Sequence, residues 1–170
     1  MILGMSTEAF TWFHVVLSLT GIFSGAAVLF GMLRATRFDR WTALFLAATA
    51  LTSATGFFFH SVEFGAPHAL GVLSLVAVTV AIVAIYTFHL DGPWRWIYVA
   101  GAMAALYLNV FVGVVQAFSK LPFLSPLAPT QTEPPFLIAQ LLVLAIFIAL
   151  GVFAIKRFHP AAKSPALSST

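Results

Sequence analysis

The chain has 170 residues and a net charge of +3, and only 8% of its residues are charged while 61% are hydrophobic. A soluble domain of this size needs many more charged residues to cover the roughly one third of its surface that folding leaves exposed, so the composition excludes a water-soluble globular protein. The few basic residues lie scattered beside apolar runs, which argues against nucleic-acid binding. The chain has no cysteine, which excludes disulfides, zinc–thiolate sites and iron–sulfur clusters.

Five mostly apolar segments, uncharged except for Arg95 at the start of the fourth, are long enough to cross a bilayer, which takes about 20 helical residues. They cover residues 9–33, 41–59, 67–88, 94–118 and 136–155. Strands are excluded because these segments are about twice as long as the strands of membrane barrels, and an open sheet leaves backbone groups unpaired in lipid. We therefore predict an all-α fold, a polytopic transmembrane bundle of five spans. Residues 1–158 form its single domain, and residues 159–170 are predicted to be a disordered cytoplasmic tail.

The basic residues are distributed unevenly among the connections. Only Lys120 lies on one side of the predicted bundle, and the other seven share the opposite side: Arg34, Arg37, Arg40, Arg95, Lys156, Arg157 and Lys163. Connections rich in Lys and Arg stay in the cytoplasm, so we predict an outside N-terminus and a cytoplasmic C-terminus.

Polar side chains within the predicted spans gather toward the outer side. At a rise of 1.5 Å per residue, each span has one roughly 6–14 Å below the outer interface. These residues are His14, Thr55, Ser74, Asn109 and Gln140. The inner halves of the spans carry few polar groups other than Thr and Tyr. We therefore predict an outward-facing polar cavity with an apolar floor, and its ligand-binding residues are His14, Ser18, Ser74, Asn109 and Gln140.

A proline-rich connection at residues 119–135 is predicted to form a stiff outer loop that acts as a lid. The residues expected at the cavity mouth or in this lid are His60, Glu63, His68, Gln116, Gln131 and Glu133. Structural roles compete with each of these assignments. Asn and Gln hydrogen-bond helices to one another, Ser and Thr bond back to their own helix, and Glu133 is placed to complement the N-terminal end of the fifth helix.

Gly21 and Gly25 share one face of the first predicted helix with His14 and Ser18, at the spacing i, i+4, i+7 and i+11. The two glycines form a G-x-x-x-G pattern, which allows another helix to approach closely. The pattern predicts tight packing, either within the bundle or in a homodimer.

Three functions compete for this architecture. The preferred hypothesis is binding of a small lipid-soluble, quinone-like molecule in the bilayer, oriented by His14, Asn109 and Gln140. The first alternative is a b-type haem held between His14 and either His60 or His68, since haem takes axial histidines that face one another. The second alternative is a structural or assembly subunit of a larger membrane complex.

Other chemistries find little support in the sequence. A divalent metal site built from His60, Glu63 and His68 is a weak hypothesis, because these residues do not share one helix. The chain has no hydrolase or phosphate-binding motif, and its spans hold no carboxylate or lysine of the kind that ion transport uses. The sequence therefore favours a protein that is not an enzyme.

Residues 106–140, LYLNVFVGVVQAFSKLPFLSPLAPTQTEPPFLIAQ, resemble an uncharacterised group of small bacterial integral membrane proteins. In that group an LNVFV-x-VVQ-x-F helix is followed by an APTQ-[ST]-EPPF loop. Residues 55–73 are similar to the same group, although less distinctively. The resemblance implies a bacterial inner-membrane location and a specific role for residues 128–136, and it implies no substrate, cofactor or catalytic residue.

Overall fold

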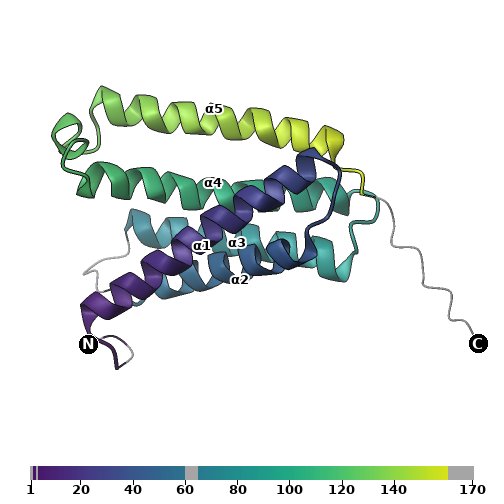
Figure 1. The fold of residues 1–170 in the computed structure, drawn as a ribbon, viewed down its shortest axis with the longest axis horizontal. Coiled ribbons are helices and arrows are strands. Elements are labelled where there is room, and N and C mark those ends of the chain that lie inside the picture. Colours follow the sequence, from purple (N-terminus) through teal and green to yellow (C-terminus); the bar gives the residue numbers. More distant parts are fainter. Residues whose placement is uncertain (1, 3, 60–64, 161–170) are drawn as a thin grey trace, which may run out of the picture.

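The computed structural model describes residues 2, 4–59 and 65–160. In this part of the chain the predicted all-α bundle is confirmed, with five long helices and no β-strand (Figure 1). The helices are α1 (Thr7–Leu33), α2 (Asp39–Gly56), α3 (Ala66–Ile82), α4 (Trp94–Lys120) and α5 (Pro134–Arg157). A π-helical segment η1 (Val83–Thr87) extends α3, and a 3-10 turn η2 (Ser125–Leu127) lies between α4 and α5. Residues 161–170 of the predicted tail lie outside the described residues.

Four helical segments are long and apolar enough to cross a membrane: Thr7–Leu33, Ala66–Thr87, Trp94–Lys120 and Pro134–Arg157. The second predicted span differs from the others. α2 has 18 residues, begins with the charged pair Asp39 and Arg40, and ends at Gly56, three residues before the predicted end. At 1.5 Å per residue it is about 27 Å long. It nevertheless runs from one end of the bundle to the other (Figure 1).

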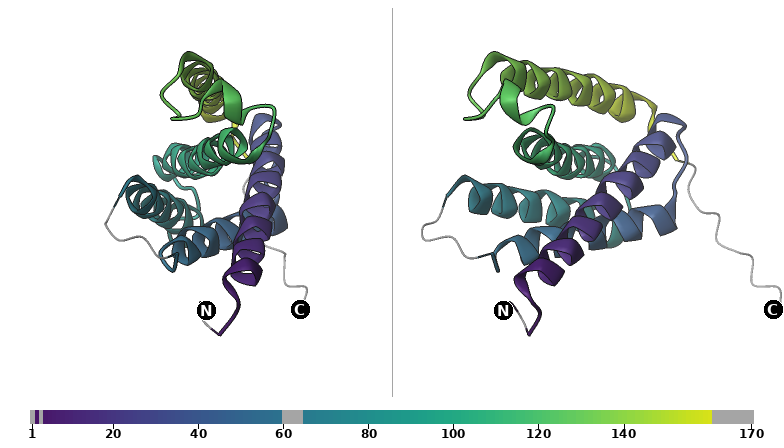
Figure 2. Two further views of the ribbon diagram at one scale, coloured as in Figure 1. Left: turned by 90° about the vertical axis from the view of Figure 1, so that its left-hand side faces the viewer. Right: turned by 60° about the vertical axis from the view of Figure 1, so that its left-hand side comes forward.

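Helices that are consecutive in the sequence pack against each other, and α1 crosses the bundle obliquely to reach α4 as well (Figure 2). α5 packs on α4, on the side away from α2 and α3, and it also contacts α1. α5 is consequently the least enclosed helix. Its exposed apolar residues include Ile138 and Leu141, each 64% exposed, as expected of a surface that lipid covers.

Two apolar clusters hold the described helices together. The larger one joins all five, and its largest buried side chains include Met32, Phe45, Tyr98 and Phe158. The smaller one consists of Phe118, Ala128 and Phe136, and it fastens the last connection to the facing ends of α4 and α5. The larger cluster thus packs one end of the α4–α5 pair, and the smaller cluster packs the other end.

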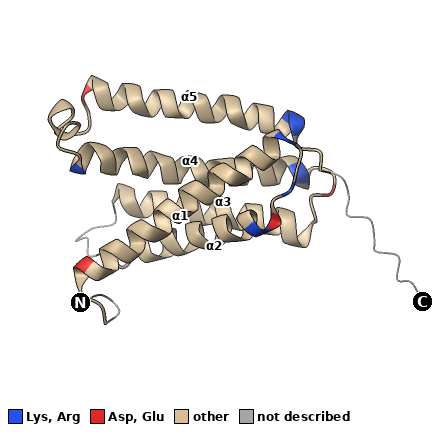
Figure 3. Ribbon diagram, viewed as in Figure 1, with Lys and Arg blue, Asp and Glu red and all other residues tan. Residues whose placement is uncertain are grey.

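The two ends of the bundle differ in the charged residues that they carry (Figure 3). We call the end where α1 and α5 finish the basic end, because it carries every described Lys and Arg except one: Arg34, Arg37, Arg40, Arg95, Lys156 and Arg157. The opposite end carries Lys120 at the end of α4, together with Glu8 and Glu133.

Candidate functional site

α2 carries a buried row of hydroxyl groups at the centre of the bundle: Thr42, Thr49, Thr52, Ser53 and Thr55. A threonine or serine in a membrane helix either bonds back to its own backbone or reaches a neighbouring helix. The row makes contact with α1, α3 and α4 through side-chain hydrogen bonds. α2 therefore links three of its neighbours by polar contacts.

His14 contacts this row at the end opposite the basic end. Its Nδ1 lies 2.8 Å from the hydroxyl oxygen of Thr55. The Thr55 hydroxyl donates its proton to the backbone, where the carbonyl oxygen of Leu51 is 2.7 Å away and that of Thr52 is 3.1 Å away. With its own proton bonded to the backbone, Thr55 is assigned as the acceptor in its bond to His14, which places the proton of the neutral imidazole on Nδ1. Nε2 of that tautomer carries an acceptor lone pair.

The ring of His14 is half-buried among aromatic side chains. It stands edge-on to Phe59, with ring centroids 5.1 Å apart, and Phe59 in turn contacts Phe10 at 5.2 Å. Phe10 is fully buried, whereas Phe13 and Phe58 near it are 45% and 47% exposed. The surroundings of His14 are therefore apolar, aromatic and open to the bilayer.

Asn109 pairs with a different member of the row. Its Nδ2 donates to the hydroxyl of Thr49 at 3.0 Å, and both groups are buried. The bond lies over Gly21, where an added Cβ would be 3.0 Å from Nδ2 of Asn109 and 3.1 Å from the Thr49 hydroxyl. Ser74 is similarly paired with Ser53, at 2.8 Å between hydroxyl oxygens.

Gln140 lies in a separate seam, between α4 and α5. Its Nε2 donates to the backbone carbonyl of Phe111 at 3.2 Å, and its buried Oε1 has no partner among the described residues. The structure therefore does not bring His14, Asn109 and Gln140 together in one chamber. Each of the three residues bonds across a different pair of helices. Gln140 contacts α4 from the side of α5, whereas Asn109 faces α2. Ser18 is half-exposed and joins none of these pairs.

The last connection folds onto its own helices rather than across the bundle. Gln131 donates from Nε2 to the backbone carbonyl of Val115, at 3.3 Å, and to the hydroxyl of Ser119, both on α4. Glu133 occupies the N-cap position of α5 but makes no side-chain bond to that helix. Its side chain therefore makes no capping hydrogen bond, although its charge lies at the N-terminal end of α5 as expected.

The carboxylate of Glu133 instead closes the loop before it. One oxygen accepts from the backbone N–H and the hydroxyl of Thr130, at 3.1 and 2.8 Å, and the other accepts from the N–H of Thr132 at 3.1 Å. Desolvation raises the pKa of Glu133, but these hydrogen bonds outweigh it, so the pKa lies below the ordinary glutamate value.

The remaining residues predicted for the cavity mouth do not form a group. Gln116 is exposed on α4. The Nδ1 of His68 accepts a bond from the N–H of Gly65 at 3.4 Å, and its ring lies 5.6 Å from that of Phe57. His60 and Glu63 lie outside the described residues. In the described part of the chain, no three His, Asp or Glu side chains gather in a way that suits a metal ion.

Gly21 and Gly25 both face the inside of the bundle. An added Cβ at Gly25 would be 2.5 Å from Leu106 Cδ1 and 2.9 Å from the ring of Phe45. The G-x-x-x-G face of α1 is thus filled by α2 and α4, so it is not free to form the alternative homodimer.

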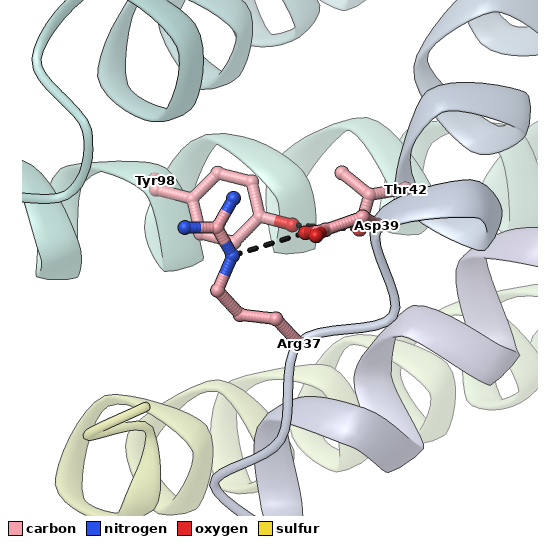
Figure 4. Close-up of polar contacts among 4 residues, drawn as sticks. All are labelled: Arg37, Asp39, Thr42 and Tyr98. Carbon is pink, nitrogen blue, oxygen red and sulfur yellow. Dashed lines mark hydrogen bonds and ion pairs between the residues drawn. The ribbon is translucent and has the colours of Figure 1, made fainter. Parts of the chain in front are cut away.

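The basic end holds a polar cluster that the sequence did not single out (Figure 4). Tyr98 is 2% exposed and its hydroxyl lies 3.4 Å from that of Thr42, while Arg37 and Asp39 form an ion pair at 3.1 Å above it. A hollow lined by Arg37, Thr42 and Tyr98, among others, has a volume of about 10 Å³, room for about one water molecule. The signal in the sequence was the spacing of Tyr98 and Asn109, which puts both on one face of α4.

A more open hollow of about 300 Å³ lies on the surface nearby, along residues 38–41. Both hollows are at the basic end, away from His14. The buried Thr42 and Tyr98 are of the two residue types expected in this otherwise apolar half.

Comparison with known proteins adds no assignment: no family model, no curated protein and no solved structure matches this chain.

Proposed function

We propose that this protein binds a small lipid-soluble molecule that carries a hydroxyl donor, such as an alkyl hydroquinone, at the ends of α1 and α2 opposite the basic end. The observation that carries the proposal is the hydrogen-bond geometry around His14. The Thr55 hydroxyl lies within bonding distance of both the backbone and Nδ1 of His14, which assigns Nδ1 as the donor to Thr55 and Nε2 as an acceptor.

The surroundings of His14 support this assignment. Small-molecule sites are mostly apolar, with a few placed polar groups that orient the ligand. Apolar ring surface around His14 is supplied by Phe10, Phe13, Phe58 and Phe59. The proposal is narrower than the sequence-based hypothesis, because Asn109 and Gln140 are used between helices and do not contribute to it.

The membrane setting belongs to the same proposal. We assign the protein to a bacterial inner membrane with its basic end in the cytoplasm. α2 is the fifth crossing, since the helices on either side of it, α1 and α3, both meet the criteria for a span and α2 joins their opposite ends. His14 would then lie within the outer half of the bilayer.

The test is a titration of the purified protein in nanodiscs with an alkyl benzohydroquinone and with the matching benzoquinone. We expect saturable binding that is tighter for the hydroquinone, since the quinone has no hydroxyl to donate to Nε2. The His14→Leu variant should lose affinity by about tenfold, the equivalent of a hydrogen bond of about 1.4 kcal/mol. The Gln140→Leu variant is the control and should bind as the parent does. Equal binding by His14→Leu and the parent contradicts the proposal.

Haem is the second candidate, because a ligand histidine with Nδ1–H anchored by a hydrogen bond and Nε2 free is the usual arrangement at a metal. His68 is not set up as the second axial ligand, because its Nδ1 accepts a bond from the N–H of Gly65 and the neutral ring then carries its proton on Nε2. A Soret absorption band in the purified protein that disappears in His14→Leu would favour haem over the hydroquinone.

A further inference from the structure

The polar side chains of the connection between α4 and α5 are paired with one another or with α4. The amide of Gln131 bonds to α4, and the carboxylate of Glu133 accepts bonds from Thr130 and Thr132. These bonds give the connection a fixed conformation.

Large apolar side chains occupy the outer surface of this loop. Phe123 is 70% exposed, Leu127 is 51% exposed and Leu121 is 39% exposed. They project from a folded framework, because Ala128 in the same connection is only 1% exposed and packs with Phe118 and Phe136. Their exposure is therefore a feature of an ordered loop.

The charge pattern and the chain direction indicate what covers these side chains. No charged residue occurs between Lys120 and Glu133, as suits a segment that lies among lipid headgroups and acyl chains. The loop continues into the apolar surface of α5, where Leu137 and Ile138 are 49% and 64% exposed. The exposed apolar side of the loop and the lipid-facing side of α5 are thus consecutive in the chain.

We propose that this loop is a membrane-interface anchor, in which Leu121, Phe123 and Leu127 insert between the headgroups and the acyl chains of the adjacent leaflet. Interfacial elements bury their apolar side by roughly 5–10 Å, about the depth that side chains at a helix end reach. The anchor fixes the adjoining ends of α4 and α5, and α5 is the least enclosed of the helices. It also explains why the loop does not extend across the bundle as a lid. The proposal is independent of the ligand at His14.

Spin labels at single cysteines test it, because the chain has no native cysteine. Phe123→Cys and Leu127→Cys are labelled in protein reconstituted into phospholipid vesicles. Leu141→Cys, on the exposed side of α5, is the lipid control, and Glu8→Cys, exposed in the first turn of α1, is the water control. Collision rates are measured with oxygen, which concentrates in lipid, and with a nickel chelate, which stays in water.

We expect the oxygen-to-nickel ratio at positions 123 and 127 to exceed that at position 8 severalfold and to approach that at position 141. A ratio equal to that at position 8 overturns the proposal, because the loop then lies in water. Labels that are immobile and inaccessible to both reagents also overturn it, because a protein surface, such as a second copy, then covers the loop.

Discussion

At the scale of single residues, Gly25 determines how closely α1 packs on the bundle. A Cβ at this position would overlap the ring of Phe45, which is 1% exposed and has no room to move. We expect Gly25→Ala to lower the free energy of unfolding by about 1–3 kcal/mol, as overpacking of a close contact does. Reversible unfolding in mixed micelles measures the effect.

Gly113 provides a matched control on α4. Its nearest neighbour for an added Cβ is Ile22 Cδ1 at 3.7 Å, an ordinary contact distance. Alanine favours a helix over glycine by about 0.5–1 kcal/mol, so Gly113→Ala should leave stability unchanged or raise it. Equal destabilisation of both variants would show that the tight contact at Gly25 does not exist.

The spacing of residues predicted which side chains of α1 face the bundle, but it did not predict which residues they contact. The spacing between positions 14, 21 and 25 correctly places His14, Gly21 and Gly25 on the inner face of α1, because helical periodicity alone decides which residues share a face. That His14 meets Thr55 while Asn109 meets Thr49 depends on the rotation and height of each helix. These are set by packing, which one sequence does not express.

At the scale of elements, α1 ends in a Schellman motif with an unfavourable residue. The N–H of Thr36 bonds to the carbonyl of Gly31 at 2.9 Å, and Ala35 between them has φ of 54°. Glycine adopts this left-handed conformation without steric cost, whereas alanine does not. Ala35→Gly should therefore stabilise the protein by about 1 kcal/mol in thermal unfolding.

Ala26→Gly is the control for this prediction. Ala26 is exposed in the middle of α1, where glycine costs about 0.5–1 kcal/mol. The same substitution should thus have opposite signs at positions 26 and 35. Destabilisation at both positions would contradict the observed end of α1.

The loop before α5 should respond to acid through Glu133. Its pKa in the folded protein lies below the ordinary value, so its bonds to Thr130 and Thr132 are at full strength above that ordinary value and are lost as the pH falls through the lowered one. NMR signals of the Thr130 and Thr132 N–H groups should shift together in that range. In Glu133→Gln this response should vanish; if it persists, another group closes the loop.

Helix ends were predicted more accurately where polarity changes than where it does not. The first predicted span ends at residue 33, as α1 does. The second was extended to residue 59, but α2 ends at Gly56 because the backbone turns while the sequence remains aromatic through Phe57, Phe58 and Phe59. Hydrophobicity measures preference for lipid, and an aromatic turn near the interface satisfies that preference as well as a helix does.

At the scale of the whole molecule, the all-helical bundle follows from composition, but the position of α5 does not. Apolar segments separated by short connections require neighbouring helices to pack antiparallel. Nothing in the sequence requires α5 to lie on the far side of α4 from α2 and α3, and this placement is what separates Gln140 from His14. For that reason the polar side chains predicted to line one cavity do not meet.

Orientation in the membrane is the remaining prediction at this scale. Six described basic residues lie at one end of the bundle and only Lys120 at the other, so the basic end should stay in the cytoplasm. A membrane-impermeant maleimide applied to intact bacterial cells should label Glu8→Cys and Gly65→Cys. It should label Arg40→Cys and Lys156→Cys only after the membrane is disrupted. The reversed pattern would invert the orientation, whereas labelling of positions 40 and 65 from the same side would mean that α2 does not cross. The experiment therefore tests two properties separately. The side from which each position is labelled gives the direction of insertion. The comparison of positions 40 and 65, which flank α2, shows whether α2 crosses the membrane.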